Sequence, residues 1–273
     1  MIAEAALGLT FAGLAGAAIG SFLTVVATRL PPLVLESPGG RVRLGPLLKS
    51  LSWPGSHCRH CENPLRWRDN IPLLSFVLLR GRCRACHTPY GSRYVLLEAA
   101  TALAACGLFF QMGWSFQAAL LFCLLAILLA LCAVDLEEML LPDILVAPLL
   151  PLGLLYQTLY GAGITAALLG AGGGFAALWL IGALYRQSRA RDGLGGGDVK
   201  LAGALGAWVG VQTLSWFLLG AFATGLIGMG LPILLGRKQA GAPVPFGPFL
   251  ALSAAVLVLW PDLSNWLSRL IAG

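Results

Sequence analysis

The chain has 273 residues, of which 58% are hydrophobic and only 11% are charged, and its formal net charge is +6. Soluble domains carry about 25% charged residues, and folding alone could not hide this much apolar surface from water. The composition excludes a disordered chain, a soluble Rossmann enzyme and a soluble nucleic-acid binder. It predicts an all-α polytopic membrane protein, because a spanning helix needs about 20 mostly apolar residues.

The first apolar run extends from about residue 5 to residue 28, and the only charge before it is Glu4. A secretory signal has a basic start and a short apolar core, and this segment has neither. We therefore expect residues 1–30 to hold a permanent first span with its N-terminus outside. A cleaved signal is the alternative.

A polar segment follows at residues 31–94, and the remainder, residues 95–273, is almost continuously apolar. We expect seven further spans, near 95–112, 115–134, 144–160, 163–185, 199–211, 213–235 and 245–261. The total is eight, or seven if the short glycine-rich segment 199–211 is not a full span.

The positive charges support this layout. Of the 18 Lys and Arg residues, only Arg269 falls on the outer side. Cytoplasmic loops carry an excess of Lys and Arg, so the polar segment is predicted to be cytoplasmic.

Four of the seven cysteines form two C-x2-C pairs in the polar segment, Cys58 with Cys61 and Cys83 with Cys86. Two such turns bring four sulfurs into a tetrahedral set, which is typical of a structural zinc site with no open position. The cytoplasm is reducing, so disulfides are disfavoured there. Disulfides or spare thiols remain the alternatives.

The arginines and histidines near the pairs have several candidate roles. Flanking arginines could offset the charge of four thiolates, and flanking histidines are candidate substitute ligands or surface residues. These side chains are Arg59, Arg82, Arg84, His57, His60 and His87. The three remaining cysteines lie singly in apolar spans and are expected to be small buried residues. They are Cys106, Cys123 and Cys132.

Two carboxylates lie at the ends of predicted spans, where acidic groups are costly and usually functional. Asp135 ends the third span, and Asp198 follows three glycines where the sixth span begins. The layout places both at the cytoplasmic face. A shared site would keep one carboxyl protonated, which suits aspartic proteolysis: one group activates water and the other polarises the scissile carbonyl. The alternative for Asp198 is a helix N-cap after a flexible turn.

Three further acidic positions are open to two interpretations. Asp143 is predicted mainly as a helix cap. Glu137 and Glu138 either belong to a solvated loop or attract a basic segment. Glu98 is either a solvated residue at a helix end or a functional carboxylate. A transporter with a cytoplasmic docking module is the competing functional class, but it would need ionisable groups along a midplane path.

Together these residues resemble the bacterial prepilin peptidases, which are bifunctional leader peptidase and N-methyltransferase enzymes of type IV pili and type II secretion. The family usually has Asn where this chain has Thr24. The matching segments, in family order, are Gly20–Val26 with Arg29–Pro31, the two cysteine pairs, Asp69–Pro72, Leu79–Cys83, Ser92–Tyr94, Glu98, Asp135, Leu141–Asp143 and Gly195–Lys200.

The resemblance implies that Asp135 and Asp198 are the catalytic pair. It implies cleavage at the cytoplasmic face of the bacterial inner membrane, after the Gly that ends a basic leader on prepilins and pseudopilins. The new N-terminal residue is then methylated with S-adenosylmethionine, an activity associated with the zinc-bearing residues 31–94, whereas 95–273 form the peptidase domain. The matching positions that would contact the substrate or support the active site are Gly195, Gly197, Lys200 and Asp143.

The methyl-donor site is not visible in the sequence, because no strand is followed by G-x-G-x-x-G. Asp69, Asn70 and Glu98 are the candidates. Turn formation and a helix terminus are the alternatives for these residues.

Overall fold

A computed structural model of the chain describes residues 2–40, 42–58, 60–89, 91, 93–189, 194–235 and 244–272. Helices form nearly all of the regular structure in these residues, and the only β pairing is two isolated bridges. The all-helical expectation is therefore confirmed. The chain forms two compact units, Met1–Ala133 and Val134–Gly273.

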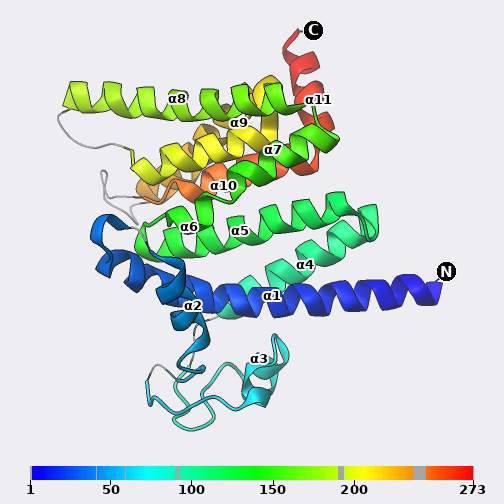
Figure 1. Cartoon of the computed structure of the whole chain (residues 1–273), viewed down its shortest axis with the longest axis vertical. Helices are drawn as coiled ribbons and strands as arrows, with labels where there is room; N and C mark the ends of the chain where they lie inside the picture. Colours follow the sequence, from blue (N-terminus) through cyan, green and yellow to red (C-terminus); the bar gives the residue numbers. More distant parts are fainter. Residues whose placement is uncertain are drawn as a thin grey trace. The chain divides into compact units, whose positions relative to one another are not determined.

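The first unit is built on two long helices that pack against each other, α1 and α4 (Figure 1). Its elements are α1 (Ile2–Glu36), η1 (Pro38–Gly40), α2 (Leu44–Ser52), η2 (Trp67–Asn70), α3 (Leu74–Leu79), α4 (Arg93–Met112) and most of α5 (Phe116–Glu138). Helix α1 continues beyond the predicted end of the span and includes Pro31 and Pro32. Proline has a φ that fits a helix, but each of these two residues removes one backbone N–H donor from the last turns of α1.

A close approach between α1 and α4 depends on Gly20. A Cβ at this position would overlap the hydroxyl of Thr101 and would lie 2.7 Å from Glu98 Cα. Only glycine lets the backbones approach this closely. Gly20 therefore determines how α1 sits beside the helix turn that carries Glu98.

The second unit is arranged around α9, against which α7, α8 and α10 pack (Figure 1). Its elements are the end of α5, α6 (Asp143–Val146), α7 (Leu149–Tyr160), α8 (Ile164–Arg189), α9 (Gly196–Leu234), α10 (Gly247–Leu259) and α11 (Pro261–Ala272).

Helix α9 contains both of the spans predicted at 199–211 and 213–235, and it breaks between them at Gly210, where φ is 73° and ψ is 166°. A Cβ on Gly174 would lie 2.5 Å from Ala202 O and 3.6 Å from Leu214 Cδ1. In a straight helix residues 202 and 214 would be about 18 Å apart. The chain therefore turns back at Gly210, and α9 consists of two legs.

Two side chains hold the first leg of α9 against α7. Gln157 Nε2 donates a hydrogen bond of 2.7 Å to Trp208 O, and Trp208 Nε1 donates one of 2.8 Å to Leu149 O. The break at Gly210 takes Trp208 O away from its ordinary helical partner, and the buried Gln157 amide satisfies it, as buried carbonyls require.

Six described helices are long and apolar enough to cross a membrane, which indicates a polytopic membrane protein. They are Ala3–Glu36, Val95–Met112, Phe116–Glu138, Asp143–Tyr160, Ile164–Ser188 and Gly196–Gly228. The apolar helix Gly247–Leu259 is shorter. The number of membrane spans would be eight if the two legs of α9 each cross the membrane and α10 crosses it as well. The predicted number of spans therefore stays a prediction.

Candidate functional sites

Asp135 lies in the last turn of α5 and is almost completely buried, with 4% of its surface exposed. Its Oδ2 accepts a hydrogen bond of 2.9 Å from the backbone N–H of Gly247, the first residue of α10. A Cβ on Gly247 would lie 2.6 Å from this oxygen. A side chain at this position would therefore displace the Asp135 carboxyl, whose orientation is fixed by the Gly247 amide.

Asp198 lies in the first turn of α9, and its side chain is partly buried. Leu141 packs against the residues beside both aspartates. A Cβ on Gly197, next to Asp198, would lie 2.9 Å from Leu141 Cβ. A Cβ on Gly247, whose amide bonds to Asp135, would lie 3.1 Å from Leu141 Cδ2. The structure thus brings Asp135 and Asp198 to the same end of the second unit.

The glycines before Asp198 allow two close contacts. A Cβ on Gly195 would lie 3.0 Å from Asp198 Oδ2, and one on Gly197 would press against Leu141. Larger side chains would displace the Asp198 carboxyl or the Leu141 side chain. These glycines are thus needed for packing around the carboxyl, beyond any flexibility they give to the turn.

Asp143 forms an ion pair with Lys200, whose Nζ lies 2.7 Å and 2.8 Å from the two carboxylate oxygens. The prediction that Asp143 caps a helix is wrong. Pro142 occupies the N-cap position of α6, which has no side-chain cap, and Asp143 is the first helical residue. The ammonium of Lys200 on α9 gives this carboxylate a charged partner, which is stronger than a backbone N–H.

The four paired cysteines meet in the first unit, with all Sγ atoms within 4.8 Å of one another. Cys58 Sγ lies 3.8 Å from Cys86 Sγ, and Cys61 Sγ lies 3.9 Å from Cys83 Sγ. A tetrahedral site with Zn–S bonds of about 2.3 Å has sulfurs about 3.8 Å apart. The cluster could therefore hold a metal ion, and its spacing fits zinc.

The two halves of this cluster have the same local structure and the same sequence pattern, C-R-x-C-x-x-P. Cys58 N donates to Asn63 O at 3.0 Å, and Cys83 N donates to Thr88 O at 2.9 Å. The residue after the second cysteine has a positive φ of 56° in both halves, at Glu62 and at His87. Each half is a tight turn that presents two sulfurs on the same side.

Hydrogen bonding within the cluster favours metal-binding thiolates. The hydroxyl and backbone of Thr88 lower the pKa of Cys86 to about 6, and the backbone amides of Cys61 and His60 lower the pKa of Cys58. The Asn63 amide lowers the pKa of Cys61, but burial and the three other cysteines outweigh it and raise that pKa to about 12. A bound cation would displace the protons of the thiols that it binds.

The residues flanking the cysteines do not join the cluster where they are described. The metal-binding group found among the described residues contains no histidine, and His57 Nδ1 lies 3.0 Å from Gly55 O. Arg84, expected to offset the thiolates, instead donates from Nε and Nη2 to Asp69. Arg59 and Ser92 lie outside the described residues.

The three methyl-donor candidates have different environments. Asp69 is buried, and the hydrogen bonds and charge of Arg84 hold the pKa of its carboxyl below the usual value. Asn70 is exposed. Glu98 is buried, and its Oε2 accepts a hydrogen bond of 2.8 Å from Leu73 N, which ties α4 to the segment before α3.

A helical membrane protein with two aspartates at the ends of apolar helices and a four-cysteine cluster is the class that these features define. The family model described as the bacterial peptidase A24 N-terminal domain matches residues 14–112, and the model of the type IV leader peptidase family matches residues 122–230. No solved structure matched the chain.

Several relatives of the chain carry the name prepilin leader peptidase/N-methyltransferase. The chain is 40% identical to the Aeromonas hydrophila protein over 262 residues, which cover 91% of this chain and 89% of the relative. It is 41% identical to the Dickeya chrysanthemi protein over 264 residues, 93% of each chain. It is 40% identical to the protein of Burkholderia pseudomallei strain 1026b over 265 residues, 92% of this chain and 85% of the relative. The chain therefore belongs to the prepilin leader peptidase/N-methyltransferase family.

Sequence reasoning did not find Gly247 or the packing role of Leu141. A glycine followed by proline at the start of an apolar run, Gly247-Pro248, was the available signal. It marks a helix N-terminus, whose free amide can bind a carboxylate.

Proposed function

We propose that this protein cleaves the basic leader from type IV prepilins and type II secretion pseudopilins, and then methylates the new N-terminal residue with S-adenosylmethionine. The observation that carries the peptidase half is the convergence of Asp135 and Asp198 around Leu141 and the Gly247 amide. The names of the relatives support both halves.

In the proposed cleavage step, one aspartate is ionised and the other is protonated. The ionised carboxylate takes a proton from water, whose oxygen attacks the scissile carbonyl carbon, and the protonated carboxyl donates to the carbonyl oxygen. The intermediate collapses, the C–N bond breaks, and the carboxyl that took the proton from water gives it to the leaving nitrogen, while the other carboxyl recovers its own proton. The Gly247 amide holds the Asp135 carboxyl in position throughout.

Zinc is the proposed metal of the cysteine cluster, held by Cys58, Cys61, Cys83 and Cys86 with one ion per chain. Four sulfur ligands leave no open position, so its role is to stabilise the segment around it. Glu98, Asp69 and Asn70 are the proposed methyl-donor residues. Glu98 and Asp69 are both buried carboxylates, but Asp69 is already ion-paired with Arg84, so Glu98 is the stronger candidate.

The proposed organisation has three functional regions: a first span at 1–30, a cytoplasmic zinc domain at 31–94 and a seven-span peptidase domain at 95–273. The N-terminus is placed outside and both sites are placed at the cytoplasmic face of the bacterial inner membrane. The distribution of Lys and Arg supports this orientation.

Mass spectrometry of a prepilin co-expressed with this protein tests both activities at once. The expected product begins after the Gly that ends the leader and carries the mass of one added methyl group. Accumulation of the uncut precursor beside folded, membrane-inserted enzyme would contradict the peptidase assignment. A cut but unmethylated product would contradict only the second activity.

A further inference from the structure

Helix α3 exposes an apolar face although it belongs to the polar segment of the chain. Leu74, Val77 and Leu78 are 49%, 70% and 68% exposed, and their spacing of three and four residues places them on one side of the helix. With six residues, α3 is only about 9 Å long, so it cannot cross a membrane as the long helices do. An apolar patch on a segment outside the spanning helices marks an interaction surface.

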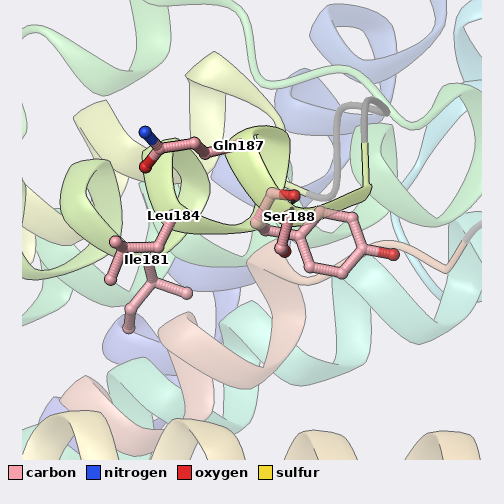
Figure 2. A pocket seen from close by; sticks show the side chains of 5 residues that line it. Ile181, Leu184, Gln187 and Ser188 are labelled. Atoms are coloured by element: carbon pink, nitrogen blue, oxygen red, sulfur yellow. Dashed lines mark hydrogen bonds between the residues drawn. The ribbon is translucent and has the colours of Figure 1, made fainter.

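Exposed apolar residues elsewhere have a simpler explanation. A hollow of about 570 Å³ on α8 is an example, and one face of this helix lines it (Figure 2). The lining residues are Ile181, Leu184, Tyr185, Gln187 and Ser188. They belong to a helix that is long and apolar enough to span the membrane itself, so lipid tails account for their exposure. The apolar face of α3 needs a separate account.

The opposite side of α3 is attached to the cysteine cluster. Phe76 follows Leu74 by two residues, about 200° around the helix, and its ring packs on Gly81, where a Cβ would lie 2.9 Å from Phe76 Cε2. Gly81 N also donates a hydrogen bond of 2.9 Å to Phe76 O, and Cys83 follows two residues later. One face of α3 is therefore fixed to the turn that holds Cys83, and the exposed apolar face points away from it.

A hydrogen bond fixes the level of α3 relative to a spanning helix. Leu73, the residue before α3, donates from its backbone N–H to Glu98 Oε2 at 2.8 Å. Glu98 lies three residues inside the apolar span Val95–Met112, about 5 Å along the helix. Interfacial segments bury their apolar faces about 5–10 Å into the boundary between headgroups and acyl chains. The hydrogen bond to Glu98 gives the start of α3 a similar level.

Helix α1 indicates this level independently. Its Gly20 lies against Glu98, because a Cβ on Gly20 would lie 2.7 Å from Glu98 Cα. No charged residue occurs in α1 between Glu4 and Arg29, and Gly20 precedes Arg29 by nine residues, about 14 Å. Glu98 therefore lies beside the apolar part of α1. Figure 1 shows α3 to one side of α1 and not beyond its end.

The charges beside α3 favour an anionic lipid surface over an apolar protein partner. Arg80 ends the helix and Arg82 follows, and both are exposed. The sequence between Asp69 and Glu98 contains four Arg and no Asp or Glu. Anionic lipids attract basic residues next to the membrane, and an apolar face beside basic residues is typical of interface-bound helices. The side chains of α3 thus match the acyl chains and the headgroups of one leaflet.

We infer that α3 is an interfacial membrane anchor. Leu74, Val77 and Leu78 enter the acyl chains of the leaflet on the side of the cysteine cluster. Arg80 and Arg82 contact the phosphates of the same leaflet. The anchor holds the cysteine cluster against the membrane surface, because the cluster is attached to the opposite face of α3. This inference goes beyond the proposed activities and does not depend on them.

Site-specific photolabelling tests the anchor in the full chain, in nanodiscs of phosphatidylglycerol and phosphatidylethanolamine. A diazirine-bearing amino acid replaces Val77, Glu62 or Leu103 in separate samples. Leu103 is exposed on a spanning helix and is the positive control, and Glu62 is exposed on a cysteine turn and is the negative control. The probe at position 77 should label phospholipid about tenfold more than the probe at position 62, close to the yield at position 103.

Two outcomes of this labelling would overturn the inference. Phospholipid labelling at position 77 no higher than at position 62, with full labelling at position 103, would place the apolar face of α3 in water. Labelling of a protein instead of lipid at position 77 would show that this face binds a protein partner.

Hydrogen exchange provides a second measurement. Val77→Asp puts a charge on the apolar face, which a membrane disfavours, so amide exchange in residues 74–79 should become about tenfold faster. Asn63→Asp is the matched control, because it adds the same charge at an exposed position of a cysteine turn. Unchanged exchange in a folded Val77→Asp protein would contradict insertion. If Val77→Asp does not fold, the photolabelling decides the question by itself.

The role of the arginines has its own test. Arg80→Gln combined with Arg82→Gln should lower lipid labelling at position 77 about fivefold in the anionic nanodiscs. The same pair of changes should have no effect in nanodiscs of phosphatidylcholine alone. An equal effect in both kinds of nanodisc would overturn the contact of these arginines with anionic phosphates.

Discussion

The cysteine cluster and the aspartate pair are built in opposite ways. Cys58 and Cys86, whose sulfurs lie 3.8 Å apart in the cysteine cluster, are 28 residues apart in the sequence, and each half of the cluster is a turn with its own backbone hydrogen bonds. Asp135 depends on the amide of Gly247, which is 112 residues away in the sequence. One site is local and the other is assembled by helix packing.

This difference predicts that the two sites respond differently to change. A local turn with its metal is maintained by its own ligands, whereas a site made by helix ends depends on every helix that positions them. Because the two sites also lie in different compact units, damage to one should leave the other largely active.

The largest expected effect is on the aspartates. Asp135→Asn or Asp198→Asn keeps the shape of the side chain but removes its proton-transfer function, so prepilin cleavage should fall on the order of 100- to 10,000-fold. Quantitative mass spectrometry of the substrate measures this. Methylation of a substrate that has already been cut should persist. Full cleavage by both variants would rule out the two-aspartate mechanism.

The complementary change is at the cysteines. Cys58→Ser combined with Cys83→Ser removes one ligand from each turn, so bound zinc should fall from about one per chain to none. Methylation should fall on the order of 100-fold, while most cleavage is retained. Elemental analysis and product mass spectra measure these results, and Cys123→Ala is the control with unchanged zinc. Zinc that persists in the double variant would exclude the cluster as its site.

A smaller change tests the positioning of Asp135. In Gly247→Ala the new Cβ would lie 2.6 Å from Asp135 Oδ2 and must push the carboxyl away. Misplacing a catalytic group by about 1 Å can cost on the order of 100-fold, so kcat for cleavage should fall by that factor. Gly230→Ala is the matched control, because a Cβ there meets nothing within 4 Å. Equal kcat values for the two variants would show that the contact is unimportant.

The smallest expected effect is at Glu98. Glu98→Gln keeps an acceptor for Leu73 N but removes the charge, so methylation should fall about tenfold, the size of one charged hydrogen bond, while cleavage is unchanged. Glu62→Gln, on an exposed position of a cysteine turn, is the control. If methylation persists in Glu98→Gln and is lost only in Glu98→Ala, the residue acts through its hydrogen bond to Leu73 alone.

Much of the site was predictable because its signals are local. The spacing of the cysteines predicts a cluster that the structure confirms as able to hold a metal. The predicted boundary between two spans near residue 212 corresponds to the break at Gly210. The cap predicted at Asp143 was wrong, because its actual partner, Lys200, is on another helix and no local pattern links them.

The sequence by itself determined the class of this protein and the location of its local chemistry. The apolar runs and the scarcity of charge can be counted along the chain without knowing the fold. The two C-x2-C turns depend only on residues that are close in sequence. Only the tertiary structure decided which distant groups share a site. It places Gly247 beside Asp135 and Lys200 beside Asp143. It also packs Leu141 against the first residues of α9 and α10. Those contacts depend on how helices pack, and packing is a property of the whole fold.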